Sequence, residues 1–432
     1  MGNAVVRVNG DEFAIVRPLG EGGFSTVHEV RRGKERFALK RSRGVSERED
    51  IERAQMEIKV QRQLQHPNNL RLLNAEIRSN RDAAKEHRNG QSLLRAAAMD
   101  GVVFGDMKEV LMVFPIMHGG TLQAFLERAA ANKIAAFSEK ECLRIFALLL
   151  DAVKELHEIG YAHRDIKPGN VLLSTSEPVE PILMDFGSVA PLDCTIRSFN
   201  DAIRECEDAA RFSSAPYRAP ELWEGSAATF RGAIDGRADV WSLGCVLYAM
   251  AFGPYSPFEH PRDGVQPLAI LSGSAIFESE SHGTTYSPTF IALIRWILTP
   301  DTALRPTLEG VRQCVQQLRF GAATTTSNSN SPLRPVETLS KEPSWADFTA
   351  FDADLTEPIG AERQPSRASF REAGSTRHHR QSSETTVKFK SSTSNRTVRV
   401  PGDSGDVNRR RAISQSGKLI LVKALSNPSI EH

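Results

Sequence analysis

Two short runs of the chain carry side chains suited to phosphoryl transfer. Residues 163–170 place a carboxylate (Asp165), an ammonium (Lys167) and an amide (Asn170) close together. Residues 185–187 (Asp-Phe-Gly) begin fifteen residues later and add the carboxylate of Asp185 on an expected tight turn. Phosphoryl transfer needs a group that orients a hydroxyl, a cation near the moving phosphoryl group and oxygen ligands for Mg²⁺. The two runs, in this order, predict that chemistry.

A glycine-rich segment stands upstream. Gly20, Gly22 and Gly23 follow an apolar stretch, residues 13–16, that is typical of a strand. Glycines let backbone amides approach phosphate oxygens because no Cβ stands in the way. Alone, such a pattern marks an ordinary turn more often than a phosphate site, and Ser25 stands where the third glycine of G-x-G-x-x-G is expected. The two runs downstream favour the phosphate site.

A lysine and a glutamate extend the pattern. Lys40 ends a strand-like run, residues 37–40, and Glu57 lies between apolar neighbours in a helical pattern over residues 51–64. Each alone is as well explained by a solvated surface charge. With the other motifs, we expect Lys40 to bind the α- and β-phosphates and Glu57 to hold it there through an ion pair.

These residues resemble those of eukaryotic protein kinases over about residues 11–320. The resemblance includes residues 219–221 (Ala-Pro-Glu), 239–244 and 305–306. Four sequence motifs are similar to those of the Numb-associated kinase family, nearest its small branch of acylated, membrane-associated Ser/Thr kinases. They lie at residues 21–25, 182–188, 217–221 and 241–250. The resemblance implies an α+β fold with a β-rich small lobe (11–116) and a larger helical lobe (117–320). It also implies ATP-dependent phosphorylation of Ser or Thr in proteins.

The resemblance assigns roles to single residues. Asp165 would orient the substrate hydroxyl, Lys167 would neutralise the transferring phosphoryl group, and Asn170 and Asp185 would bind Mg²⁺. Residues 114–120 would form the hinge, with Phe114 closing the pocket behind adenine; plain core packing is the alternative for its apolar members. The residues expected to bind ATP are Leu19, Gly20, Gly22, Gly23, Val27, Ala38, Lys40, Glu57, Pro115, Met117, Asn170, Leu172 and Asp185.

The segment from Asp185 to Glu221 resembles an activation segment. Arg164 would pair with a phosphorylated residue there, and the candidate acceptors are Thr195, Ser198, Ser213 and Ser214. Ser214 stands three residues before Tyr217, where kinases place a hydroxyl that bonds the catalytic aspartate and lysine, so a structural role is expected for it. A helix over 200–211, with Ile203, Cys206 and Ala210 near one face, would allow activity without phosphorylation. By resemblance, Glu221 pairs with Arg305, and Asp239 holds the catalytic loop.

Composition excludes several other classes of protein. The formal net charge is +1, with 40% hydrophobic and 25% charged residues, which argues against a nucleic-acid partner or a wholly disordered chain. The five cysteines are widely spaced without a Cys-x-x-Cys pair, so neither zinc nor disulfides are expected. We expect a reducing, cytoplasmic location, with no secretory leader and no transmembrane helix.

Both ends of the chain leave alternatives open. Gly2 permits N-myristoylation, although Val6 stands where Ser or Thr is usual. One acyl chain binds membranes weakly, so the options are weak peripheral association at Golgi or vesicle membranes and an ordinary N-terminus. Residues 79–106 are expected to form an insertion. Residues 321–432 are rich in Ser, Thr and Arg and are expected to be disordered.

Two short segments of this tail differ in composition from the rest. Residues 345–351, from Trp345 to Phe351, followed by acidic residues, resemble the aromatic-acidic peptides that bind clathrin-adaptor appendages; the alternative is that they have no role. Residues 409–414 resemble a basophilic kinase site at Ser414, a patch for acidic lipids or a solvated charge run. For the whole chain, the rival hypotheses are a pseudokinase scaffold and a trafficking adaptor with a kinase fold. A dehydrogenase is disfavoured because no βαβ unit surrounds Gly20.

Overall fold

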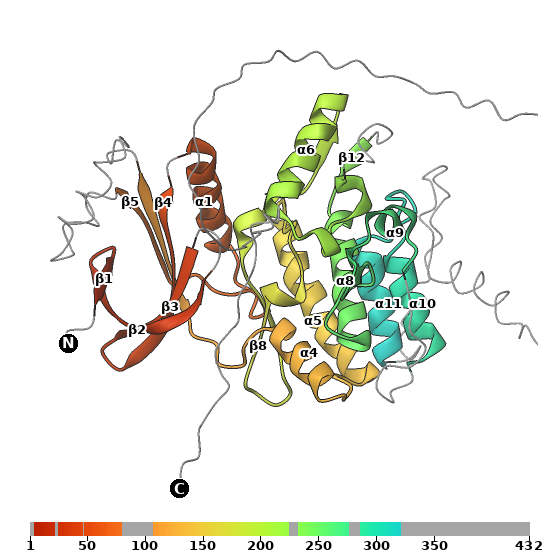
Figure 1. Ribbon diagram of the computed structural model, residues 1–432, viewed down its shortest axis with the longest axis horizontal. Helices are drawn as coiled ribbons and strands as arrows, with labels where there is room; N and C mark the ends of the chain where they lie inside the picture. The colour runs from red at the N-terminus through yellow and green to blue at the C-terminus, as the bar shows by residue number, and fades with distance from the viewer. Residues whose placement is uncertain are drawn as a thin grey trace, which may run out of the picture. The chain divides into compact units, whose positions relative to one another are not determined.

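The computed structural model describes residues 4–21, 25–45, 47–79, 107–223, 232–275 and 286–320 (Figure 1). A six-stranded antiparallel sheet comes first along the chain and a helical region follows. This confirms the predicted α+β class, with a β-rich small lobe and a helical large lobe. Gly2, Gly22, Gly23, residues 80–106 of the expected insertion and the whole tail past Phe320 lie outside the described residues.

The sheet of the small lobe has the strand order β1-β2-β3-β4-β6-β5. Its strands are β1 (Val5–Val8), β2 (Asp11–Glu21), β3 (Ser25–Arg32), β4 (Glu35–Val45), β5 (Asn74–Ser79) and β6 (Lys108–Pro115). The sheet therefore begins ahead of residue 11, where the lobe was predicted to start. Asn9 and Gly10 join β1 to β2 with φ angles of 48° and 86°. Two positive φ angles define the type I′ hairpin turn, for which Asn-Gly is the preferred sequence.

The two faces of the sheet bury different apolar clusters. Side chains alternate along a strand, so Leu111 and Val113 of β6 join the cluster beside β1, together with Val6, Val8, Phe13, Val30 and Leu39. Met112 and Phe114 of β6 belong to the other cluster, which includes Ile58 of the helix α1 (Arg48–Gln61). This helix begins three residues before the predicted 51–64 and ends before Leu64.

A buried ionic group ties the outer strands together. Glu109 on β6 is 1% exposed and accepts hydrogen bonds from Arg41 on β4 and from Arg78 on β5, the latter at 2.8 Å. Burial alone would raise the pKa of Glu109, but the two guanidinium groups outweigh it and hold that pKa below its usual value. Arg78 also donates to the carbonyl of Arg7 at 3.0 Å, which fastens β1 to β5.

The core of the large lobe lies around two long helices, α5 (Glu139–Glu158) and α8 (Arg237–Phe252). A capping box starts α5: Glu141 accepts the backbone N–H of Ser138 at 2.9 Å, and Ser138 Oγ accepts that of Glu141. The remaining helices are α4 (Leu122–Ala131), α6 (Phe199–Phe212), α9 (Pro267–Ser272), α10 (Pro288–Ile297) and α11 (Leu308–Phe320). Within the described ranges, no helix combines the length and apolarity needed to cross a bilayer.

Short hairpins and turns position the loops that carry chemistry. Asn170 ends the turn η1 (Pro168–Asn170), and Asp185 immediately precedes the turn η2 (Phe186–Ser188). The strands β8 (Val171–Leu173) and β9 (Pro181–Leu183) connect these two turns as an antiparallel pair. The other short elements are β7 (Tyr161–Ala162), β10 (Ala190–Pro191), β11 (Cys194–Ile196), β12 (Gly232–Ile234), β13 (Glu259–His260), β14 (Gly264–Val265), η3 (Ala215–Tyr217) and η4 (Pro220–Leu222).

The predicted helix over 200–211 is present as α6, and its packing decides which residues are buried. Ala202 and Cys206 are buried and Ala209 packs against the core, whereas Ala210 is exposed. Ile203 also packs against the core, so two of the three residues predicted near one face contact it. The inner stripe follows positions i, i+4 and i+7 from Ala202, and 203, 206 and 210 follow a neighbouring stripe.

Candidate active site

Asp165 lies at the centre of a dense hydrogen-bond network and is 2% exposed. Its carboxylate accepts from Lys167 Nζ at 2.9 Å and from the backbone N–H of Ser214 at 2.7 Å. The amide of Asn170 donates to the backbone carbonyl of Asp165 at 2.8 Å and to its carboxylate at 3.1 Å. These contacts fix the direction of one carboxylate beside one ammonium group.

Asp239 of α8 binds the backbone of the loop that carries Asp165, as predicted by resemblance. Its carboxylate, 0% exposed, accepts the N–H groups of His163 at 2.7 Å and Arg164 at 2.9 Å, and it contacts His157 Nε2 at 2.9 Å. Burial alone would raise the pKa of Asp239, but the hydrogen bonds and charge of the two histidines outweigh it and lower that pKa. The contact supports Arg164 at a φ of 65°, which non-glycine residues rarely adopt.

Lys40 joins the small lobe to the turn at residue 185. Its ammonium donates to Glu57 Oε1 of α1 at 2.8 Å, which is the predicted ion pair, and to Asp185 Oδ1 at 2.9 Å. The two carboxylates raise the pKa of Lys40 although burial opposes this, so the amine stays charged. A Cβ on Gly187 would lie 3.3 Å from Glu57 Oε2, so a side chain there would crowd the same carboxylate.

Asn170 and Asp185 offer oxygen atoms suited to Mg²⁺. The backbone N–H of Met184 donates to the carbonyl of Asn170 at 2.9 Å, which brings the two segments together. The Asp185 side chain is 44% exposed, and the Asn170 amide uses its nitrogen towards Asp165. Two hard oxygen ligands fit an ion that completes its shell with phosphate oxygens and water. The described residues hold no cluster of three or more His, Cys, Asp or Glu side chains.

The residues predicted to surround adenine are only partly brought together. Ala38, Met117 and Leu172 pack against one apolar cluster that includes Phe114, which is 6% exposed. Val27 lies opposite Lys40 in the sheet and outside that cluster. Of the remaining residues, Leu19 is 40% exposed, Gly20 lies opposite Val27, and Pro115 ends β6 opposite Phe37.

Three of the four candidate phosphate acceptors are engaged in structural hydrogen bonds. Ser198 caps α6 by accepting the N–H of Asp201 at 3.2 Å. Ser213 is 9% exposed; it donates to the carbonyl of Ala209 and accepts from Arg218 Nε at 2.8 Å. The hydroxyl of Ser214 bonds Lys167, whereas its backbone N–H reaches Asp165. Thr195, on β11, is exposed.

Two further contacts attach the activation segment to other parts of the chain. Glu221 forms the predicted ion pair with Arg305 at 2.8 and 2.9 Å, and these side chains are 3% and 0% exposed. The sequence did not predict the second attachment. Arg211 at the end of α6 reaches Asp50 of α1 at 3.1 Å, and the guanidinium of Arg53 lies 3.3 Å from the ring centre of Phe212.

These groups form a site for phosphoryl transfer: a fixed carboxylate beside an ammonium, a second lysine held by two carboxylates, and two oxygen ligands for a divalent ion. Comparison with known proteins agrees with this class. Residues 13–318 match the protein kinase domain. Serine/threonine-protein kinase 16 of Mus musculus and that of Homo sapiens are each 32% identical over 305 residues, which is 70% of this chain and 88% of the relative.

A more distant relative agrees as well. Serine/threonine-protein kinase ENV7 of Saccharomyces cerevisiae is 26% identical over 355 residues, which covers 73% of this chain and 94% of the relative. The chain belongs to the protein kinase family and is an ATP-dependent serine/threonine-protein kinase.

Proposed function

We propose that Asp165 and Lys167 carry the transfer of the ATP γ-phosphate to a Ser or Thr hydroxyl of a protein. Asp165 accepts a hydrogen bond from that hydroxyl and directs it at the phosphorus, and Lys167 offsets charge on the transferring group. The observation that carries this proposal is the Asp165 network, in which Lys167, Asn170 and Ser214 all contact the same residue. Little covalent chemistry is left to the protein, so positioning and charge supply most of the rate.

We propose the remaining roles by resemblance to protein kinases. Lys40, held by Glu57, binds the α- and β-phosphates, while the hinge backbone at Pro115 and Met117 binds adenine between Ala38 and Leu172. Asn170 and Asp185 hold Mg²⁺, which would neutralise phosphate charge when bound. Since Ser198, Ser213 and Ser214 already serve structural hydrogen bonds, we propose that the kinase is active without phosphorylation at these three serines.

Phosphate transfer to a peptide panel tests the assignment. We expect the full chain to transfer phosphate from Mg·ATP to Ser or Thr peptides, and Asp165→Asn to lower kcat by about 10²- to 10⁴-fold. The matched control is Glu158→Gln, which neutralises an exposed carboxylate at the end of α5. If wild type and Asp165→Asn both bind ATP and neither transfers phosphate, the chain acts as a scaffold and the assignment is wrong.

We further propose that the kinase belongs to the Numb-associated family and works in membrane trafficking. The sequence supports this through the motifs that resemble that family, through Gly2 directly after Met1 and through residues 345–351. The proposal includes a cytoplasmic location, weak peripheral binding to Golgi or vesicle membranes and contact with a clathrin-adaptor appendage. Substituting Trp345 and Phe348 by Ala should abolish binding to a purified appendage domain; unchanged binding would exclude this segment as the contact.

A further inference from the structure

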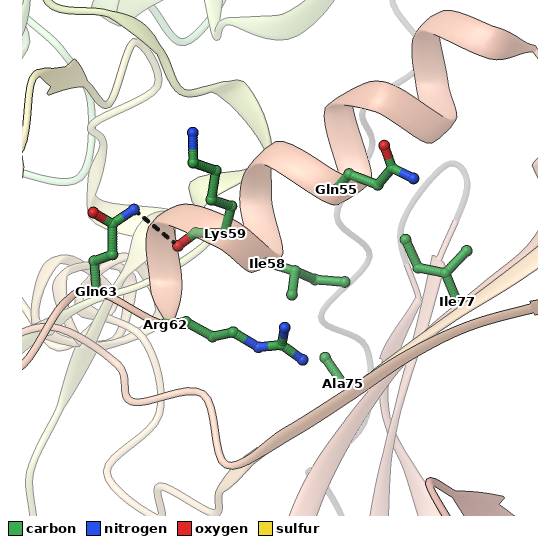
Figure 2. Close-up of a pocket in the computed structure, with 7 residues that line it drawn as sticks. All are labelled: Gln55, Ile58, Lys59, Arg62, Gln63, Ala75 and Ile77. Atoms are coloured by element: carbon green, nitrogen blue, oxygen red, sulfur yellow. Dashed lines mark hydrogen bonds between the residues drawn. The ribbon is translucent and has the colours of Figure 1, made fainter.

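A groove lies between α1 and β5 of the small lobe (Figure 2). It encloses about 400 Å³, which lies within the range of small ligand pockets. Ile58, Ala75 and Ile77 form its apolar floor, and Gln55, Lys59, Arg62 and Gln63 line its rim. Ile58 and Arg62 are one helical turn apart, and Glu57 occupies the neighbouring stripe that faces Lys40.

The groove has a positive rim and an apolar floor. None of the described residues that line the groove is acidic. Figure 2 shows the Arg62 guanidinium extending towards Ala75, whereas Lys59 leaves the helix on another side. Lys59 is engaged elsewhere, because its ammonium donates to the hydroxyl of Tyr161 at 3.3 Å. Arg62 is therefore the cation that faces an occupant of the groove. The complementary ligand is an extended segment that offers aromatic side chains and carboxylates.

We infer that the occupant is the chain's own acidic-aromatic segment, residues 342–355. This segment contains Trp345, Phe348 and Phe351, with carboxylates at Glu342, Asp347, Asp352 and Asp354. It has no Lys or Arg, although basic residues are common in the rest of the tail. Aromatic side chains bury much apolar surface with little loss of rotamer freedom, and a carboxylate can pair with Arg62 in a bidentate manner.

The length of chain allows the contact. The described domain ends at Phe320, and residues 321–344 can span at most about 80 Å when extended. A folded domain of this size has a radius of gyration of only about 20 Å, so the groove is within reach. A tethered segment binds as if at millimolar concentration. Weak intrinsic affinity is therefore enough to fill the groove.

Occupation of the groove stabilises α1 in the position that pairs Glu57 with Lys40. An aromatic ring against Ile58 and Ile77 adds packing between α1 and β5, on the stripe next to Glu57. This consequence for activity rests on the proposed function, whereas the docking itself does not. Adaptor binding through the same aromatic residues would compete with docking.

Binding of a synthetic fluorescent peptide of residues 342–355 tests the docking. In the full chain, Trp345, Phe348 and Phe351 are replaced by Ala so that the tethered segment no longer fills the groove. We expect the peptide to bind this released chain about tenfold or more tightly than wild type, whose groove is already occupied. Arg62→Glu in the released chain should weaken the peptide about tenfold, since it replaces an attraction by a repulsion.

Two controls make the result specific. Arg128→Glu, at an exposed position of α4, changes the net charge equally and should leave peptide binding unaltered. A peptide with Asp347→Lys and Asp352→Lys should bind the Arg62→Glu chain better than the wild-type groove. Absence of peptide binding, or binding that is equal with and without Arg62→Glu, overturns the proposal.

An activity measurement then separates the two proposals. The released chain should show a lower kcat/KM than wild type, by about two- to tenfold, and the added peptide should restore it. If wild type transfers no phosphate while the peptide still binds through Arg62, the proposed function fails and the docking stands. If wild type is active but the peptide does not bind, the docking fails alone.

Discussion

Two of the attachments of the activation segment are built in opposite ways. At its end, Glu221 and Arg305 are fully paired and almost completely buried, and Arg305 also donates to the carbonyls of Arg237, Thr299 and Pro300. At α6, Arg211 is 47% exposed and contacts carboxylates that are 38–82% exposed. The first contact joins two parts of the large lobe, and the second joins the segment to α1 of the small lobe.

Because of this difference, we expect the buried pair to affect mainly stability and the exposed contact to affect mainly activity. A buried pair contributes little net energy compared with apolar residues, but losing one partner leaves an uncompensated charge. An exposed pair is weak and screened by salt. The buried pair is therefore expected to decide whether the large lobe folds. The exposed contact biases the position of α1, and with it the Glu57 carboxylate that holds Lys40.

The largest effect is expected at the buried pair. Arg305→Ala should lower the free energy of unfolding by about 3–5 kcal/mol, because Glu221 remains buried without its cation. Denaturant unfolding measures the change. Replacing both residues, with Glu221→Leu and Arg305→Met, should recover much of the loss. The comparison is wrong if the single variant behaves like Arg262→Ala, which removes an exposed arginine.

An intermediate effect is expected at Ser213. Its hydroxyl accepts from Arg218 Nε and donates to the carbonyl of Ala209. Ser213 and Arg218 are both buried. Ser213→Ala should cost about 1–3 kcal/mol of unfolding free energy, since a buried charged donor loses its acceptor. Activity at low temperature should change little, because the Ser213 hydroxyl bonds Ala209 and Arg218, which have no role in the transfer step. A collapse of activity without loss of stability would instead mark Ser213 as a regulatory position.

The contrast also explains what the sequence could predict. The runs at 163–170 and 185–187 and the capping box at Ser138 are local patterns, whose residue types and spacing are sufficient to recognise them. The strand β1 had a local signal as well, because Asn9-Gly10 is a preferred hairpin turn. The predicted small lobe nevertheless begins at residue 11, after this strand. Phe13 and Leu39 bury their side chains against that strand, so its omission left part of the small-lobe core unassigned.

Other contacts had no local signal. Glu109 is 68 residues from Arg41, and Arg211 is 161 residues from Asp50. Charges of this kind look like solvated surface residues until the fold brings them together. In α6, small residues occur on two neighbouring stripes, and only the packing of the helix decides that Ala209 is covered while Ala210 is exposed.

The smallest effect, on activity alone, is expected at Arg211. Its contacts with Glu47, Glu49 and Asp50 hold the first turn of α1. Each exposed pair is worth about 0.2–1 kcal/mol. Arg211→Ala should therefore lower kcat/KM by about two- to fivefold in low salt and leave the unfolding transition almost unchanged. Salt screens these pairs, so wild type should approach the variant as the ionic strength rises.

A double-mutant cycle decides whether this contact acts through α1. Asp50→Ala alone should cause a smaller loss, because Glu47 and Glu49 still contact Arg211. Adding Asp50→Ala to Arg211→Ala should change little, since its partner is already gone. Arg204→Ala is the matched control: it removes an exposed arginine of α6 that, in the described part of the chain, pairs within its own helix, with Asp201 at 3.8 Å. Fully additive losses, or an equal loss in the control, would mean that α6 affects the rate without holding α1. In that case the contact between Arg211 and α1 would not be an activating attachment, and only the stabilising role of the buried pair would stand.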